Sequence, residues 1–307
     1  MKPSRRFLRK PKKFWAHVRT LGQHLGYTVR NSQQIKVPTI TEMRNALAAL
    51  GLNARSVGTD ARHTALGASL RAYFLHRAKV LQNFVEPHLM DAAEAKKLFI
   101  KTRAQFNPSC PLPMNKQKGK KKAPAFLTGM VNMLIEKNSG AMTCDYNPLE
   151  LTTVTHAGAP LRTLARRVDG AFPSPVNPIA VWEIKEYYYT TTFGSRVADG
   201  VYESLLDGLE LEELREETGV DVKHYLVIDS HFTWWCCGRS YLCRIIDMLH
   251  MGYVDEVLFG REVVDRLPAL VRGWARIARE REKAARTRNA RAPRERSNRA
   301  RNTSSAG

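Results

Sequence analysis

Two acids and an amine, Asp169, Glu183 and Lys185, have the types and spacing best suited to chemistry in this sequence. Glu183 and Lys185 flank Ile184 in an apolar, β-branched and aromatic run, which is typical of a buried strand. Because side chains alternate along a strand, Glu183 and Lys185 share one face. Adjacent strands lie about 4.8 Å apart, so an acid at the end of a neighbouring strand can approach Glu183. Two carboxylates that close repel each other, and the pattern therefore predicts a cation between them.

The elements that must position these residues follow from the flanking sequence. The stretch 170–179 contains Ser-Pro and Asn-Pro pairs and is expected to be a loop, joining a strand that ends near Asp169 to the strand of Glu183. A helix is predicted from about residue 195 to residue 217, with an interruption near Gly208. Residues 222–228 are expected to form a buried strand that runs parallel to the Glu183 strand, since a helix connects the two.

A divalent metal is the simplest cation for this site. Mg²⁺ favours one or two carboxylates, several waters and a substrate phosphate, and Mn²⁺ is an accepted substitute. Lys185 would then face a phosphate oxygen or the attacking water. Taken singly, an E-x-K triplet is common as a surface charge pair and Asp-Gly is an ordinary turn signal, so the prediction depends on their combination.

The order of an acid at a strand end, a variable hairpin, E-x-K on the next strand and a following helix resembles the PD-(D/E)XK nuclease superfamily. The resemblance covers roughly residues 125–230, with Val168 in place of the proline that names the motif. It implies an α/β fold with a restriction-endonuclease-like core, in which helices flank a central mixed sheet of four or more strands. The implied activity is metal-dependent hydrolysis of DNA phosphodiester bonds.

The same resemblance assigns roles to individual residues. Asp169, Glu183 and the backbone carbonyl of Ile184 would hold the metal, and Lys185 would orient the water or stabilise charge on the phosphoryl oxygens. Family members often supply a third carboxylate from the first helix, and Glu136 is the candidate here. It is equally explained as an exposed helical acid.

Several basic residues are expected to contact phosphates. The arginines beside the site and on the following helix are explained equally well as ordinary surface charge or helical ion pairs. The lysines of the linker are explained equally well as part of a solvated loop. Glu203, on the same helix, is implied to lie near the metal without binding it. The predicted phosphate contacts are Arg166, Arg167, Arg196, Lys118, Lys120, Lys121 and Lys122.

The overall charge favours a polyanionic partner. The formal net charge is +20, and basic residues concentrate at both ends of the chain. Neutralising phosphates releases condensed counterions and drives binding to a polyanion, and the resemblance implies that this partner is duplex DNA. No apolar run approaches the roughly 18 residues of a membrane span, and no membrane partner is expected. Five cysteines without a C-x-x-C pair fit a reduced cytoplasmic compartment, with the nucleoid as the location in a bacterium.

The chain divides into five predicted segments. Thr39 with Glu42 and Asp91 with Glu94 have capping-box spacing and mark two helix starts in a helical module that could read DNA. A Pro268-containing stretch near the end is expected to break or kink a helix. The segments are a flexible basic arm (1–38), the helical module (39–114), a basic linker (115–123), the catalytic domain (124–280) and a disordered basic tail (281–307).

Two other functions fit the same residues. One is a nucleic-acid-binding protein that keeps this fold without catalysis, and the other is an RNA-directed factor in which the basic ends bind and the Asp169–Lys185 hairpin is ordinary structure. Cutting both strands of a duplex would require a homodimer or repeated binding. The sequence identifies neither the recognition site nor a methyltransferase partner.

Overall fold

The computed structural model describes residues 1–303 except 30, 31, 33 and 190–193, and it leaves out the side chains of 196, 285 and 288–303. A sheet of four strands lies at its centre, in the order β3 (Gly170–Phe172), β4 (Ala180–Glu186), β5 (Lys223–Asp229) and β6 (Glu256–Phe259). β3 is antiparallel to β4, and the other neighbours are parallel. The predicted mixed α/β class, with a mixed four-stranded sheet and an N-terminal helical region, is confirmed.

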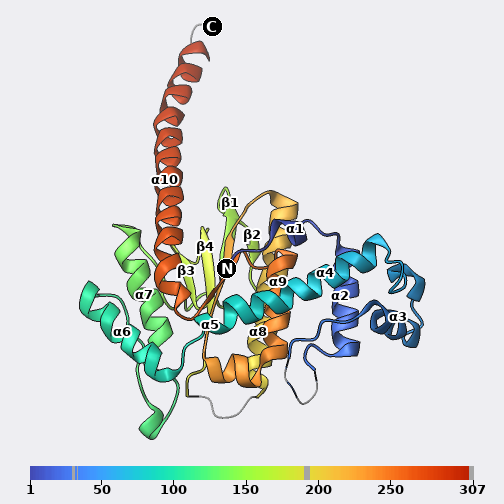
Figure 1. Cartoon of the computed structure of the whole chain (residues 1–307). Helices are drawn as coiled ribbons and strands as arrows, with labels where there is room; N and C mark the ends of the chain where they lie inside the picture. The colour runs from blue at the N-terminus through green and yellow to red at the C-terminus, as the bar shows by residue number, and fades with distance from the viewer. Residues whose placement is uncertain (30–31, 33, 190–193, 304–307) are drawn as a thin grey trace.

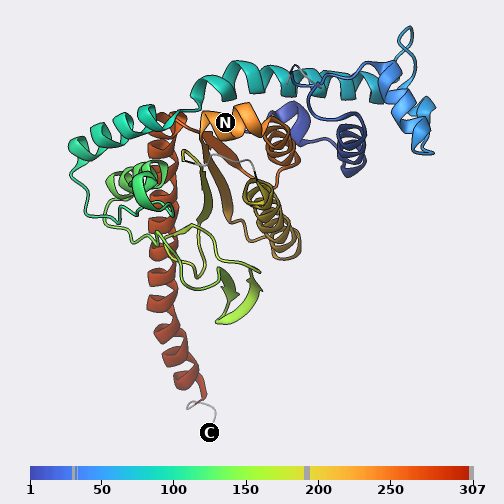
Figure 2. The same cartoon turned by 90° about the horizontal axis from the view of Figure 1, so that it is seen from below.

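Helices cover both faces of the sheet (Figures 1 and 2). α6 (Ala92–Phe106), α7 (Phe126–Ser139) and the first part of α10 (Glu262–Thr303) pack on the face that carries Trp182. The Trp182 ring stacks on Trp274 of α10, with ring centroids 5.8 Å apart. This face is apolar because alternate residues of β4 and β5 present large side chains to the helices.

The opposite face is covered by α8 (Ser195–Thr218), α9 (Arg239–Met251) and the π-helix η4 (His231–Cys237). Glu183 and Lys185 point to this face, toward α8, while Trp182 points away from it. The alternation predicted from the sequence therefore places the charged pair beneath α8. β4 and β5 are parallel because α8 crosses from the end of one strand to the start of the other.

The N-terminal region packs as part of the fold rather than as a flexible arm. Phe14, Trp15, Val18 and Leu21 recur at helical spacing and are buried, and Pro11 immediately precedes the first residue of their helix, a position where proline is tolerated. Both predicted capping boxes are present. The helices of this region are α1 (Arg5–Leu8), α2 (Lys12–Leu25), α3 (Ile40–Ala49), η1 (Ala54–Val57), α4 (Ala65–Val80), η2 (Leu81–Val85) and α5 (Glu86–His88).

A buried ion pair joins this region to the sheet domain. Arg77 of α4 donates to both carboxylate oxygens of Asp247 on α9, at 3.1 and 2.9 Å, and Tyr73 donates to the same carboxylate at 2.5 Å. Arg77 is 1% exposed and Asp247 3%. Burial opposes the charged form, but the Asp247 carboxylate holds the pKa of Arg77 above its ordinary value.

A separate two-stranded sheet projects from the body (Figure 2). β1 (Thr153–His156) and β2 (Ala159–Thr163) form this hairpin, and β2 ends well before Asp169, where the sequence predicts the end of a strand. Residues 164–169 are irregular chain instead of the end of a strand. This irregular segment carries Arg166 and Asp169.

The last helix, α10, runs far beyond the body in Figure 1. It continues through Pro268 as one helix, so the predicted break is absent. Residues 281–303 extend it as helical backbone, and disorder of the tail in solution stays a prediction. None of the described helices combines the length and the apolar character needed to cross a membrane.

Candidate active site

The β3–β4 hairpin brings Asp169 and Glu183 together. The Asp169 N–H donates to the Trp182 carbonyl at 3.1 Å and to Glu183 Oε1 at 3.2 Å. The Ile184 N–H donates to Asp169 Oδ2 at 2.7 Å. Since the N–H and C=O of one strand residue point the same way, the Ile184 carbonyl faces the same edge as Asp169. The two carboxylates and this carbonyl are therefore neighbours.

Asp169 precedes its strand instead of ending one. β3 begins at Gly170, and a methyl group there would lie 2.1 Å from the Trp182 ring. Such a contact is sterically impossible, so the Asp-Gly pair serves close packing of β3 on β4 rather than a turn. The sequence shows the glycine but not the ring that requires it.

Lys185 lies between two acids. Its Nζ donates to Glu183 Oε2 at 2.8 Å and to Glu203 Oε2 of α8 at 2.9 Å. Glu183 is 0% exposed and Lys185 7%, so the pair is shielded from water. Gly200 of α8 makes room for the lysine, because a methyl group there would lie 3.1 Å from the lysine stem.

Arg166 faces these acids rather than the solvent. Its guanidinium donates to Glu183 at 2.8 and 3.2 Å and to Asp207 Oδ2 at 2.7 Å, and it lies 3.5 Å from Glu203 Oε2. The cation predicted between the acids is thus supplied here by the chain itself. The prediction that Arg166 is available for phosphate does not hold in this arrangement, because its guanidinium is bound to carboxylates.

The pKa values of the acids differ with their surroundings. Asp169 is exposed as a whole residue, but burial of its carboxyl group and the Glu183 charge raise its pKa to about 6. Burial, opposed by Arg166, raises the pKa of Asp207 to about 7. Burial would also raise the pKa of Glu183, but Lys185 and Arg166 lower it below its ordinary value.

The amine of Lys185 holds its proton. Burial favours the neutral amine, but the charges of Glu183 and Asp169 outweigh it and raise the pKa of Lys185 above the ordinary value. The group is therefore a cation at neutral pH. It can stabilise negative charge but cannot act as a base.

Glu136 is not part of the cluster. It lies on α7, which packs on the Trp182 face of the sheet, so the sheet separates it from Glu183. Its carboxylate accepts hydrogen bonds from the backbone and hydroxyl of Ser109. The prediction that Glu136 supplies the third carboxylate is wrong in this geometry, because helix packing directs it to the other side.

Two acids of α8, rather than Glu136 of α7, complete the cluster of carboxylates. Glu203 was expected near the site, and Asp207, four residues later, lies on the same helix face and was missed. The i, i+4 spacing of the two acids was the available signal. Asp207 is 0% exposed, and its Oδ1 has no hydrogen-bond partner.

The remaining predicted phosphate contacts lie outside the cluster. Arg167 is exposed beside it, and the side chain of Arg196 is outside the described residues. The linker lysines are exposed on a loop that leads into α7. The first turn of α7, where this loop ends, is bound by Glu186 at the end of β4. Those lysines are Lys118, Lys120, Lys121 and Lys122.

The donor chemistry of the cluster fits a hard divalent cation. Four carboxylates supply oxygen ligands, and the buried Asp207 Oδ1 has no hydrogen-bond donor. Within the described chain, however, no three His, Cys, Asp or Glu side chains surround a common point. In the cluster, the guanidinium of Arg166 and the amine of Lys185 lie between the carboxylates.

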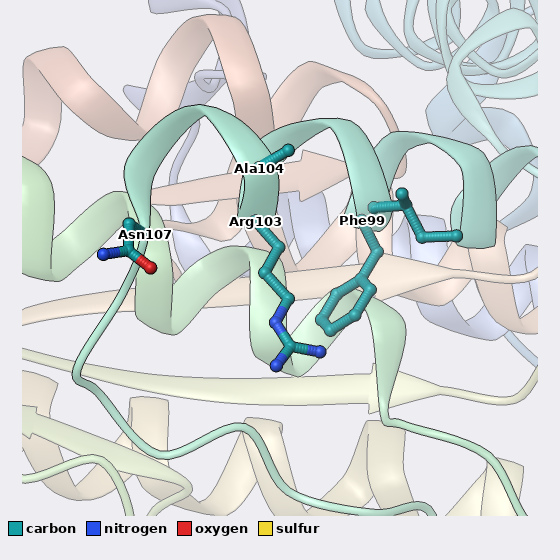
Figure 3. Close-up of a pocket in the computed structure, with 5 residues that line it drawn as sticks. Phe99, Arg103, Ala104 and Asn107 are labelled. Atoms are coloured by element: carbon teal, nitrogen blue, oxygen red, sulfur yellow. The ribbon is translucent and has the colours of Figure 1, made fainter.

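Two surface hollows lie elsewhere. One, of about 430 Å³, is lined by five residues of α6 and its end (Figure 3). The other, of about 770 Å³, lies between α2, the end of α3 and α4, with Lys10 and Lys13 among its lining residues. Neither includes a residue of the carboxylate cluster.

The fold and the cluster define a mixed α/β protein whose charged site lies where a short antiparallel strand joins a parallel sheet. The chain belongs to the family described as "Domain of unknown function (DUF7687)", whose model matches residues 90–274. A second family model, described as "Domain of unknown function (DUF7690)", matches residues 1–84. The chain matches no curated protein and no solved structure.

Proposed function

We propose that the protein is a metal-dependent endonuclease that hydrolyses phosphodiester bonds of DNA. The observation that carries the proposal is the arrangement of Asp169, Glu183 and Lys185. Lys185 Nζ lies 2.8 Å from Glu183, which accepts from the Asp169 N–H at 3.2 Å. An acid beside a hairpin, E-x-K on the next strand and a following helix are the features on which the PD-(D/E)XK resemblance rests.

Asp169, Glu183 and the Ile184 carbonyl would hold Mg²⁺ or Mn²⁺. The bound ion would polarise the scissile phosphate and lower the pKa of an attacking water. Asp169, with a pKa of about 6, is mostly ionised at neutral pH and can act as a ligand there. Lys185 keeps its proton, so its role is to stabilise charge that develops on the phosphoryl oxygens.

Charge elsewhere on the chain supports a nucleic-acid substrate. The net charge is +20, and the linker lysines are exposed on a loop that leads into α7. Phosphate contacts of this kind position a duplex without reading its sequence. Cleavage of both strands would call for a homodimer, and a role in restriction or phage defence is an extension by fold resemblance.

A plasmid-nicking assay tests the proposal. We expect supercoiled plasmid to be nicked with Mg²⁺, to stay intact with EDTA, and to be nicked about 10²-fold or more slowly by Lys185→Met, in line with the loss of one preorganised electrostatic group. The matched control is Lys223→Met, which removes a lysine of β5 that pairs with Asp221 and Asp255 away from the cluster. Metal-independent nicking, or equal rates for the two variants, would refute catalysis by this site.

A second function is favoured by the ion pairs themselves. Lys185 and Arg166 already pair with the acids, as in a protein that keeps the fold and binds nucleic acid without cutting it. In that case the nicking assay shows no cleavage, while duplex DNA still binds. Competition between duplex DNA and structured RNA at a fixed salt concentration then separates a DNA-binding protein from an RNA-directed one.

A further inference from the structure

The guanidinium of Arg166 joins two acids that are fully buried. Glu183 and Asp207 are each 0% exposed, and Arg166 donates to Glu183 Oε1 at 2.8 Å and to Asp207 Oδ2 at 2.7 Å. A divalent cation bound by both acids would have to occupy the space that the guanidinium fills. Arg166 is therefore a cation built into the site.

The cluster is short of positive charge even with Arg166 in place. Two cations, Arg166 and Lys185, face four acids, which leaves two negative charges unbalanced when all are ionised. The acids are Asp169, Glu183, Glu203 and Asp207. Asp207 Oδ1 is buried and has no hydrogen-bond partner, which is rare for a carboxylate oxygen. A single guanidinium thus satisfies the site incompletely, and exchanging it for a doubly charged ion would reduce the imbalance from two negative charges to one.

Arg166 is placed so that its side chain can leave while its backbone stays. Leu164 and Val168 on either side are 2% and 4% exposed and anchor the irregular segment, whereas the Arg166 side chain is 23% exposed. The neighbouring Glu203 side chain is 42% exposed, so the edge beside the guanidinium is open to solvent. Rotation of one long side chain would carry the guanidinium from the carboxylates to this edge.

We infer that Arg166 is an exchangeable cation. When its guanidinium engages a phosphate of the nucleic acid, it moves away from Glu183 and Asp207, and these two carboxylates then bind a divalent metal. A phosphate offers the guanidinium the same two-pronged hydrogen bonding that a carboxylate offers. The inference rests on the proposed function, and it adds Asp207 to the residues that hold the metal. Metal and nucleic acid then bind cooperatively, and each strengthens the other by the same factor.

Binding of Mn²⁺ alone, followed by the electron paramagnetic resonance signal of the free ion, tests this without any measurement of cleavage. We expect Arg166→Met to bind Mn²⁺ about tenfold or more tightly than the unaltered protein, because the competing cation is gone. Arg167→Met is the matched control, since it removes the same charge from the adjacent exposed residue and should change the affinity little. Adding Asp207→Asn to Arg166→Met should abolish the gain.

The unaltered protein provides a second measurement in case Arg166→Met does not fold. Saturation with a DNA duplex of about 20 base pairs should tighten Mn²⁺ binding about tenfold or more. Equal Mn²⁺ affinity with and without duplex, or tight binding that Arg166→Met does not improve, would overturn the exchange.

The outcomes separate this inference from the proposed nuclease activity. Cooperative Mn²⁺ and DNA binding without plasmid nicking would retain Arg166 as an exchangeable cation and remove the catalytic role. Mg²⁺-dependent nicking by a protein whose Mn²⁺ affinity is independent of Arg166 would retain the catalytic role and rule out Arg166 as an exchangeable cation.

Discussion

Replacing Asp207 with asparagine should stabilise the metal-free protein, and more so at high pH. The ordinary pKa of an aspartate is 3.8, and burial raises that of Asp207 to about 7. The folded state therefore holds this proton more tightly than the unfolded state. Stability is lost as the pH rises from about 4 through 7, since ionising the buried group costs free energy. Asparagine has nearly the same shape, keeps an oxygen for Arg166 and does not ionise.

The size of the effect follows from the two pKa values. At about 1.4 kcal/mol for each tenfold change, the interval from 3.8 to about 7 corresponds to an upper limit of roughly 4 kcal/mol. About half of this, ~2 kcal/mol, develops between about pH 5.5 and pH 8. Relaxation of neighbouring side chains reduces it, so we expect the advantage of Asp207→Asn to grow by about 1 to 2 kcal/mol over that range.

Urea unfolding of both proteins in EDTA at the two pH values measures this difference. Using the change with pH cancels any constant effect of the amide on hydrogen bonding. Asp199→Asn, an exposed position on the same helix, is the control and should show little change with pH. An advantage that is absent, or that shrinks as the pH rises, would show that Asp207 is not a destabilising buried acid.

Three further predictions concern other parts of the chain. Gly170→Ala should lower the free energy of unfolding by about 1 to 3 kcal/mol in urea, because the methyl group would meet a tryptophan ring at 2.1 Å, whereas Gly273→Ala, with nothing within 4 Å, should be neutral or stabilising. Asp247→Asn should cost about 3 to 5 kcal/mol and lower the melting temperature, since it leaves the guanidinium of Arg77 buried without its partner. Glu136→Gln should leave the plasmid-nicking rate unchanged. A loss of rate as large as that caused by Lys185→Met would show that Glu136 belongs to the active site.

The sequence was informative where a pattern is local. The capping-box spacing of Thr39 and Glu42 fixes a helix start within four residues, and alternation along a strand puts Glu183 and Lys185 on one face. The environment of Arg166 could not be obtained in this way. It lies in irregular chain, where no period relates position to direction, and its orientation depends on buried neighbours at 164 and 168.

Glu136 and Asp207 illustrate the same limit of prediction from the sequence. Both are helical acids, and although the i, i+4 spacing of Glu203 and Asp207 was a signal for α8, the sequence does not show which face of the sheet α7 or α8 covers. The choice is made by which face of β4 each helix covers, and this depends on how residues far apart in sequence pack. The preference for Glu136 came from the family resemblance, which does not determine packing in this chain.

The free energy needed to bury the charges of the cluster indicates that the cluster is more than a structural contact. Buried ion pairs contribute little net stability, because desolvation offsets the attraction. Here the pairing is also incomplete, with four acids facing two cations and one buried oxygen without a donor. A fold selected only for stability would gain by replacing Asp207 with a neutral residue of similar volume. That a buried, unbalanced acid lies beside Glu183 and Lys185 is therefore what a site kept for binding a cation predicts, and the pH dependence of Asp207→Asn measures how much stability the chain gives up for it.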